Sequence, residues 1–281
     1  MAYSAEISRS NPSMFLFLLD QSGSMADPFG GGSGAAGGKK DQKVADAINN
    51  LLFNLTIKCA KSEGVRDYYH VGVLGYGEKV GPALGGELAG KEIAPISKIA
   101  DAPERVEERI KKVDDGAGGI IEQKVRFPIW FSPVSKGGTP MSEVLKKAHS
   151  VVQTWISEHP DCFPPIVINI TDGESTDGSP LKAAEQLREL KSSDGEVLLF
   201  NVHLSSKTGS TFEFPSSESE LPDQYAKQLF NMSSALPEHI RVAAQGEGFG
   251  VTENSRGFVF NADIVSVIRF LDIGTRPSNL R

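Results

Sequence analysis

Asp20, Ser22 and Ser24 place one carboxylate and two hydroxyls at alternate positions of a short segment. This segment directly follows the apolar run 14–19, which predicts a buried strand. Open α/β sheets bind their ligands beyond the carboxyl ends of their strands, so a site is expected here. Carboxylate and hydroxyl oxygens suit Mg²⁺, Mn²⁺ or Ca²⁺ better than Zn²⁺. The segment therefore predicts part of a site for a hard divalent cation.

Two later segments can complete such a site. Thr139 stands before Pro140, and Asp172 follows the apolar run 166–170, which predicts a second buried strand. Each piece also has a plain structural reading. Thr139 can cap a helix that starts at Pro140, Asp172 can form a turn with Gly173, and the first segment can be an ordinary turn. The occurrence of all three pieces in one chain, each after a strand-like run, favours the metal site.

The order Asp-x-Ser-x-Ser, distant Thr and distant Asp resembles the metal-ion-dependent adhesion site of von Willebrand factor A (VWA) domains. The resemblance implies that Ser22, Ser24 and Thr139 ligate the ion, and that Asp20 and Asp172 hold it directly or through water. It also implies a non-catalytic module that captures an acidic side chain of a partner protein through the bound cation. Mg²⁺ is the first choice of metal, with Mn²⁺ or Ca²⁺ as alternatives.

Thr139 lies in the sequence Gly-Gly-Thr-Pro, and no signal peptide is visible. In both respects the chain is more similar to intracellular bacterial VWA proteins than to integrin or matrix domains. The chain resembles the tellurite-resistance-associated VWA group in particular. This resemblance implies that the protein acts together with a protein kinase and a metal-dependent phosphatase in a stress-response or antiviral defence system. An alternative is an accessory subunit of an AAA+ ATPase, which would be another polypeptide because this chain carries no nucleotide motif.

No catalytic set is visible in the sequence, and we expect no enzymatic activity. A haloacid-dehalogenase-type phosphatase also places an Asp after its first strand and uses Mg²⁺. That chemistry needs a second Asp two residues on, where this chain has Ser22. The Gly-rich loop 25–38 does not match a phosphate-binding P-loop either. Ser33 stands at the first glycine position, and Lys40 follows Lys39 where Ser or Thr is required.

Composition narrows the class of protein. The 281 residues carry a formal net charge of −7, which disfavours broad nucleic-acid binding because that needs a basic face. No apolar stretch approaches the roughly 20 residues of a membrane helix. The two cysteines, Cys59 and Cys162, are distant in sequence and predict reduced, partly buried thiols. We therefore expect a cytoplasmic protein with protein partners, and without nucleic-acid or membrane partners.

Strand-like and helix-like patterns alternate, which predicts an α/β fold with a mostly parallel, doubly wound sheet and helices on both faces. The predicted strands are 14–20, 70–76, 125–131, 166–171, 197–204 and 257–260. The predicted helices are 44–55, 101–113, 140–159, 179–190 and 262–271, the second supported by Glu–Lys pairs four residues apart. Asp177 or Ser179 is expected to cap the fourth helix.

We expect one domain over residues 1–281, with its core at about 13–271. Three parts depart from a minimal domain. They are a flexible Gly-rich loop at 25–38, an insertion at 81–125 and an irregular segment at 205–257.

Overall fold

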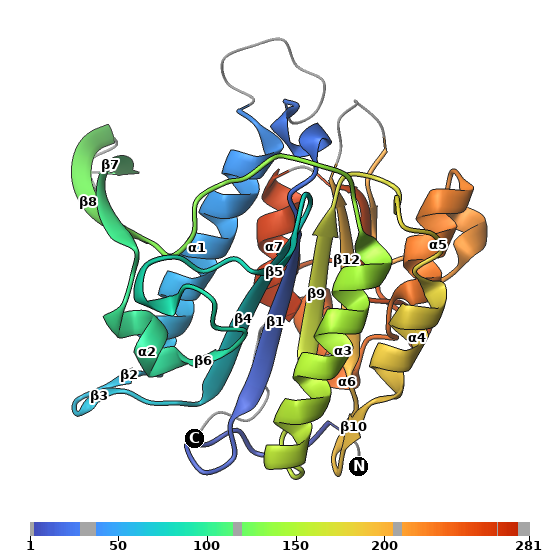
Figure 1. Ribbon diagram of the computed structural model, residues 1–281, viewed down its shortest axis with the longest axis horizontal. Helices are drawn as coiled ribbons and strands as arrows, with labels where there is room; N and C mark the ends of the chain where they lie inside the picture. The colour runs from blue at the N-terminus through green and yellow to red at the C-terminus, as the bar shows by residue number, and fades with distance from the viewer. Residues whose placement is uncertain (1–2, 29–37, 115–119, 205–209, 263, 275–281) are drawn as a thin grey trace.

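The computed structural model describes residues 3–28, 38–114, 120–204, 210–262 and 264–274. Its centre is a sheet of parallel strands, which are β1 (Ser13–Asp20), β4 (Tyr69–Tyr76), β9 (Ile166–Thr171), β12 (Leu198–Leu204) and β14 (Phe258–Ala262). Their spatial order is β14-β12-β9-β1-β4. Figure 1 shows β12, β9, β1 and β4 side by side. The predicted α/β fold with a mostly parallel sheet is therefore confirmed.

Short antiparallel strands extend both edges of this sheet. β13 (Phe212–Glu213) pairs with β14, while β5 (Val80–Pro82) and β6 (Ala94–Pro95) both pair with β4. Part of the predicted insertion 81–125 thus belongs to the main sheet, and the extent of the insertion stays a prediction. Two small ribbons lie apart from the sheet: β2 (Ala60–Lys61) with β3 (Gly64–Val65), and β10 (Lys191–Ser192) with β11 (Gly195–Glu196).

Helices cover both faces of the sheet, as predicted (Figure 1). One face carries α1 (Lys40–Cys59), α2 (Ile96–Asp101), α6 (Glu238–Gly246) and α7 (Ile264–Gly274). The other carries α3 (Met141–Glu158), α4 (Leu181–Glu189) and α5 (Gln224–Met232). β1 is buried along its whole length because alternate side chains enter the two layers. Phe17 packs on the side of α1, and Leu18 packs on the side of α3.

The chain reverses its course across the sheet between β1 and β9. From β1 it moves outward to β4, and it then returns to the other side of β1 to form β9, β12 and β14 in turn. Doubly wound sheets place their ligand sites at such a reversal, outside the carboxyl ends of the strands. β1 ends at Asp20 and β9 ends at Thr171, so the two loops that follow start at this point.

A chain of buried hydrogen bonds crosses the sheet. The Tyr76 hydroxyl donates to Asn169 Oδ1 at 2.7 Å, and Asn169 Nδ2 donates to Asn201 Oδ1 at 3.0 Å. Asn201 Nδ2 in turn donates to Ser233 Oγ, 2.9 Å away and directly after α5. All four residues are buried, so their polar atoms depend on one another for partners. The chain joins β4, β9, β12 and the end of α5.

The helix predicted over 101–113 is wrong. α2 ends at Asp101, and the residues after it form β7 (Arg105–Asp114), which pairs antiparallel with β8 (Ile120–Ile129). The Glu–Lys spacing that suggested a helix suits a ribbon equally well, because a ribbon pairs opposite charges between its strands. Glu108, for example, lies opposite Arg126.

The β7–β8 ribbon is anchored to α1 and does not join the main sheet (Figure 1). The Arg109 guanidinium lies 3.9 Å from the centre of the Phe127 ring and 2.9 Å from Asp46 Oδ1 on α1. The strand predicted at 125–131 is therefore the last part of this ribbon rather than a strand of the main sheet.

The segment 205–257, predicted as irregular, contains β13, α5 and α6. Its residues 205–209, like residues 29–37 of the Gly-rich loop, lie outside the described residues. The first residues after β1 form a single 3₁₀ turn at Gly23–Ala26. Within the part of the chain that the structure describes, no helix has the length and apolar character needed to cross a bilayer.

Candidate metal centre

Asp20 is held at the carboxyl edge of the sheet by two hydrogen bonds. β1 and β9 are parallel neighbours with Leu19 opposite Ile170, so the next residues, Asp20 and Thr171, also meet. The Thr171 hydroxyl donates to Asp20 Oδ2 at 2.7 Å, and the Ser22 N–H donates to Asp20 Oδ1 at 2.8 Å. Asp20 is only 3% exposed. Its carboxylate is therefore fixed before any ligand arrives.

Ser22, Ser24 and Asp172 form a continuous line of oxygens. The Ser22 and Ser24 hydroxyls are 3.0 Å apart, and Ser24 donates to Asp172 Oδ1 at 2.8 Å. The 3₁₀ turn that starts after Ser22 brings Ser24 over towards the loop that follows β9. The structure thus brings together four of the five predicted ligands from two separate parts of the chain.

Thr139 is buried beside the same loop. Its N–H donates to Thr176 Oγ1, and the Thr176 N–H donates to the Thr139 carbonyl, both at 2.9 Å. A Cβ placed on Gly173 would lie 3.7 Å from Thr139 Oγ1, so this hydroxyl borders the turn that carries Asp172. The structure gives no direct hydrogen bond between the Thr139 hydroxyl and the other four predicted ligands among the described residues.

Backbone contacts hold the first loop against the segment that carries Thr139. The Gly23 N–H donates to the Gly137 carbonyl at 3.0 Å, and the Lys136 N–H donates to the Gln21 carbonyl at 2.6 Å. Gly137 has φ +90°, and a Cβ there would lie 2.4 Å from the Glu78 nitrogen. Only glycine fits this position. The Gly-Gly-Thr-Pro segment therefore serves the site through its backbone as well as through Thr139.

The predicted cap of α4 is wrong, and the alternative role of Thr139 as a helix cap does not hold either. The residue before α3 is Pro140, and the Thr139 side chain does not cap the helix. Asp177 caps α3 instead of α4: its two carboxylate oxygens accept from the Ser142 and Glu143 N–H groups at 3.0 and 2.8 Å. The cause is proximity, because the loop after β9 passes over the first turn of α3, where unpaired N–H groups need acceptors. Ser179 does not cap α4, which starts after Pro180 without a side-chain cap.

Lys40 is a residue of this site that the sequence analysis did not predict. Its ammonium forms an ion pair with Asp172 Oδ2, and both side chains are 0% exposed. Lys40 is the first residue of α1, where a cation opposes the helix dipole. A lysine at an unfavourable helix position, just after a Gly-rich loop, is a signal that could have identified it.

Tyr225 and His203 form a second layer around the loop after β9. The Tyr225 hydroxyl donates to the Gly173 carbonyl, and its ring meets His203 edge to face with centroids 5.5 Å apart. Burial lowers the pKa of His203 to about 4, so the ring is neutral at physiological pH. Tyr225 comes from α5, inside the segment expected to be irregular, which is why it was not predicted.

The electrostatics of the site are those of a buried acidic pair with one counter-charge. Burial raises the pKa of Asp20 to about 6; the negative charge of Asp172 adds to this, while the hydrogen bonds from Ser22 and Thr171 oppose it. A cation bound nearby would favour the ionised carboxylate.

The donor set fits a hard cation, although it is poor in charged ligands. No group of three or more His, Cys, Asp or Glu side chains that could hold a metal exists among the described residues. Hydroxyls must therefore supply part of any coordination shell, as the alignment of Ser22 and Ser24 with Asp172 allows. Oxygen-only ligands suit Mg²⁺, Mn²⁺ or Ca²⁺ and not Zn²⁺. The Lys40 ammonium, which is paired with Asp172, opposes the binding of a metal cation beside it.

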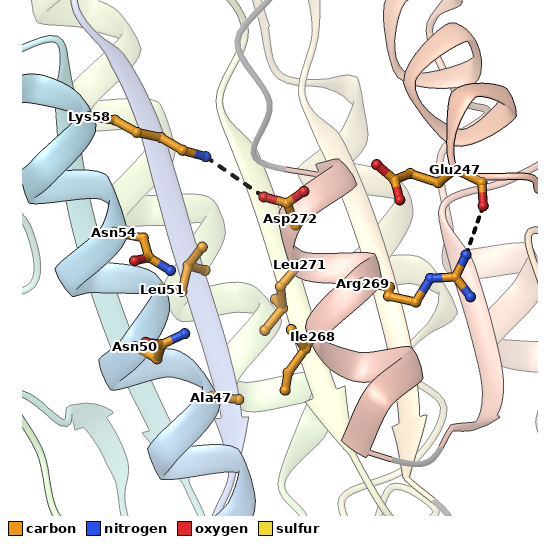
Figure 2. Close-up of a pocket in the computed structure, with 10 residues that line it drawn as sticks. All are labelled: Ala47, Asn50, Leu51, Asn54, Lys58, Glu247, Ile268, Arg269, Leu271 and Asp272. Atoms are coloured by element: carbon orange, nitrogen blue, oxygen red, sulfur yellow. Dashed lines mark hydrogen bonds and ion pairs between the residues drawn. The ribbon is translucent and has the colours of Figure 1, made fainter. Parts of the chain in front are cut away.

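A pocket of about 240 Å³ lies away from this site, between α1 and α7 (Figure 2). Leu51 and Asn54 of α1 face Ile268 and Leu271 of α7 across it. At its end, the Lys58 ammonium lies 3.7 Å from Asp272 Oδ1.

Comparison with known proteins identifies no family. No family model matches the chain, and no curated protein matches it. Among solved structures it is similar to the vWF domain of the type V pili tip protein Mfa5 from Porphyromonas gingivalis, to three N-terminal domains of that protein, and to the pilus adhesin RrgA from Streptococcus pneumoniae.

These three likenesses are low. Each has 14% sequence identity and a TM-score of 0.32. They cover 59%, 59% and 61% of this chain, but only 39%, 20% and 22% of the respective proteins. At this TM-score the likeness establishes neither a shared fold nor a shared function.

Proposed function

We propose that this chain is a non-catalytic, VWA-type protein-binding module that captures an acidic side chain of a partner protein through a divalent cation. The observation that best supports this proposal is the line of oxygens from Ser22 through Ser24 to Asp172, beside the fixed carboxylate of Asp20. These groups come from loops at the reversal point of the sheet, where doubly wound folds bind ligands.

Ser22, Ser24 and Thr139 are proposed as neutral ligands, with Asp20 and Asp172 as the charged ones. When bound, the cation would supply a positive centre with exchangeable water positions that a partner carboxylate can fill. The role of the chain is to fix these ligands in advance. Thr171 orients Asp20, Tyr225 holds the Gly173 carbonyl next to Asp172, and Asp177 ties the same loop to α3.

The partner is proposed to be a protein of a bacterial multi-component stress-response or defence system. A protein kinase or a phosphatase follows from the sequence resemblance, and an AAA+ ATPase is the alternative. The cytoplasmic location expected from the sequence is part of the same proposal. These finer assignments rest on the sequence resemblance alone, and the identity of a captured partner decides between them.

A phosphatase role is disfavoured by the position of Ser22. Its hydroxyl lies 3.0 Å from the Ser24 hydroxyl, at the place where a haloacid-dehalogenase-type enzyme needs a second carboxylic acid. Magnesium-dependent hydrolysis of a generic phosphoester, lost in Asp20→Asn, would replace our proposal with an enzymatic one.

The direct test is a pull-down from native lysate with the tagged chain, in Mg²⁺ and in EDTA. Wild type is compared with the double variant Ser22→Ala/Ser24→Ala. Ser217→Ala/Ser219→Ala is the matched control, because those two hydroxyls are also two residues apart, lie 2.7 Å from each other and are not among the proposed ligands. We expect a partner retained only in Mg²⁺, by wild type and by the control. Retention of the same partner by the Ser22/Ser24 variant or in EDTA would contradict metal-bridged capture.

A further inference from the structure

The ion pair between Lys40 and Asp172 is the least expected feature of the site. Both side chains are completely buried, and lysine is almost never fully buried unless it is paired. Such a pair is weak evidence for a stabilising role, because taking both charges out of water costs about as much as their attraction returns. A reason connected with the site itself is therefore needed.

The two oxygens of Asp172 have different partners. Oδ1 accepts from the Ser24 hydroxyl at 2.8 Å, and Oδ2 accepts from the Lys40 ammonium. Oδ1 thus faces the proposed ligands, while Oδ2 faces α1. Lys40 does not take the carboxylate away from the site; it holds Asp172 from behind and leaves one oxygen directed at Ser24.

The start of α1 is fastened to the first loop of the site. The Lys40 N–H donates to the Asp27 carbonyl at 3.0 Å, and Pro28 pairs with Lys39 in an antiparallel bridge. The position of the ammonium is therefore determined by the same loop that carries Ser22 and Ser24. Helix stability does not explain a lysine here, since the positive charge opposes the dipole at the helix N-terminus.

We propose that Lys40 is a built-in counter-cation that sets the affinity of this site for divalent metal. Without metal, its ammonium neutralises Asp172 and keeps the loop after β9 in place. With metal, two cations lie beside the same carboxylate, and their repulsion weakens metal binding. Occupancy by Mg²⁺ then responds to the available concentration of the ion, and the site does not remain permanently filled. The inference rests on the proposed function and concerns its regulation.

The test compares metal binding and thermal stability in wild type, Lys40→Met and Lys40→Gln. Lys58→Met is the matched control, because Lys58 lies on the same helix in an exposed Lys–Asp pair. Mn²⁺ and Mg²⁺ are titrated by calorimetry, and the melting temperature is measured in EDTA and in Mg²⁺. We expect Lys40→Met to melt lower than wild type in EDTA, to gain more from Mg²⁺, and to bind either ion about tenfold more tightly or better. The control should match wild type in all three measurements.

Lys40→Gln keeps a polar side chain with a hydrogen-bond donor, one bond shorter than lysine, but removes the charge. It provides the same comparison if Lys40→Met does not fold in EDTA, and it should also bind metal more tightly than wild type. Equal affinities in wild type and in the folded Lys40 variants would overturn the role of Lys40 and leave the metal site standing. Absence of binding to Mn²⁺ and Mg²⁺ in every variant would overturn the metal site itself, and with it the proposed function.

Discussion

Helix α1 carries a Lys–Asp pair near each of its ends, and the two pairs differ in almost every physical respect. At its start, Lys40 and Asp172 are both 0% exposed. Near its end, Lys58 and Asp272 are 44% and 46% exposed, with 3.7 Å between Nζ and Oδ1 (Figure 2). Lys58 stands in the last helical turn, where a cation is favoured by the dipole, whereas Lys40 stands where it is opposed.

The comparison teaches that residue type alone does not indicate what an ion pair does. The Lys58–Asp272 pair is solvated and screened, and such surface pairs contribute little. The Lys40–Asp172 pair is desolvated, so the loss of Asp172 removes the buried charge that faces the Lys40 ammonium. The Lys58–Asp272 pair lies where α7 packs against α1. The Lys40–Asp172 pair lies at the proposed metal centre.

The largest expected effect comes from Asp172→Ala. This change leaves the Lys40 ammonium buried without its carboxylate partner, and the free energy of unfolding should fall by about 3–5 kcal/mol. Urea denaturation in EDTA measures it. A loss below about 1 kcal/mol would show that the pair is solvated, and the contrast between the two ends of α1 would disappear.

An intermediate effect is expected from the pH dependence of Asp20, the other carboxylate of the site. Burial raises its pKa from 3.8 to about 6, so the folded protein holds this proton more tightly than the unfolded chain does. The protonated Asp20 carboxyl group therefore adds its full contribution to stability below about pH 4, and this contribution is lost as the pH rises through about 6. In EDTA, wild type should therefore lose about 1–3 kcal/mol relative to Asp20→Asn across this range.

Asp20→Asn is the reference in this measurement because an amide does not titrate, and other groups cancel in the difference. A difference that stays constant between pH 4 and pH 6 would contradict the burial argument. The measurement therefore tests whether a carboxylate of the site behaves as a buried group, in contrast to the half-exposed Lys58–Asp272 pair near the end of α1.

The smallest effect is expected from Asp272→Ala. The pair with Lys58 is half exposed, and its removal should cost less than about 1 kcal/mol, a loss that shrinks further at high salt. Urea denaturation at low and high salt checks both parts. A loss as large as that of Asp172→Ala would mean that Asp272 has a structural role in fixing α7 that its exposure does not suggest.

Sequence patterns predicted the centre of the fold because its strands are buried on both faces and read as continuous apolar runs. Asp20 and Asp172 could be placed near each other for the same reason, since each directly follows or nearly follows such a run. The β7–β8 ribbon was predicted wrongly because charges alone do not distinguish a helix from a ribbon that pairs opposite charges.

The rest of the site could not be predicted because it depends on contacts between distant parts of the chain. Lys40 reaches Asp172 across 132 positions, and Tyr225 reaches Gly173 across 52. Neither contact has a periodic signal. Asp177 caps α3 rather than the helix that follows it, because spatial proximity decided the partner and sequence proximity did not.

The buried amides of Asn169 and Asn201 have a consequence for strand alignment. These two residues are direct partners in the parallel pairing of β9 and β12, and the pairs on either side of them are apolar. A slip of two residues would keep each apolar side chain on its own face, so hydrophobic packing would resist it only weakly. The same slip would break the hydrogen bond from Asn169 Nδ2 to Asn201 Oδ1 in the buried centre of the sheet, which is costly. These hydrogen bonds in the middle of the sheet thus fix the register of β9 against β12, and with it the position of the loop that follows β9.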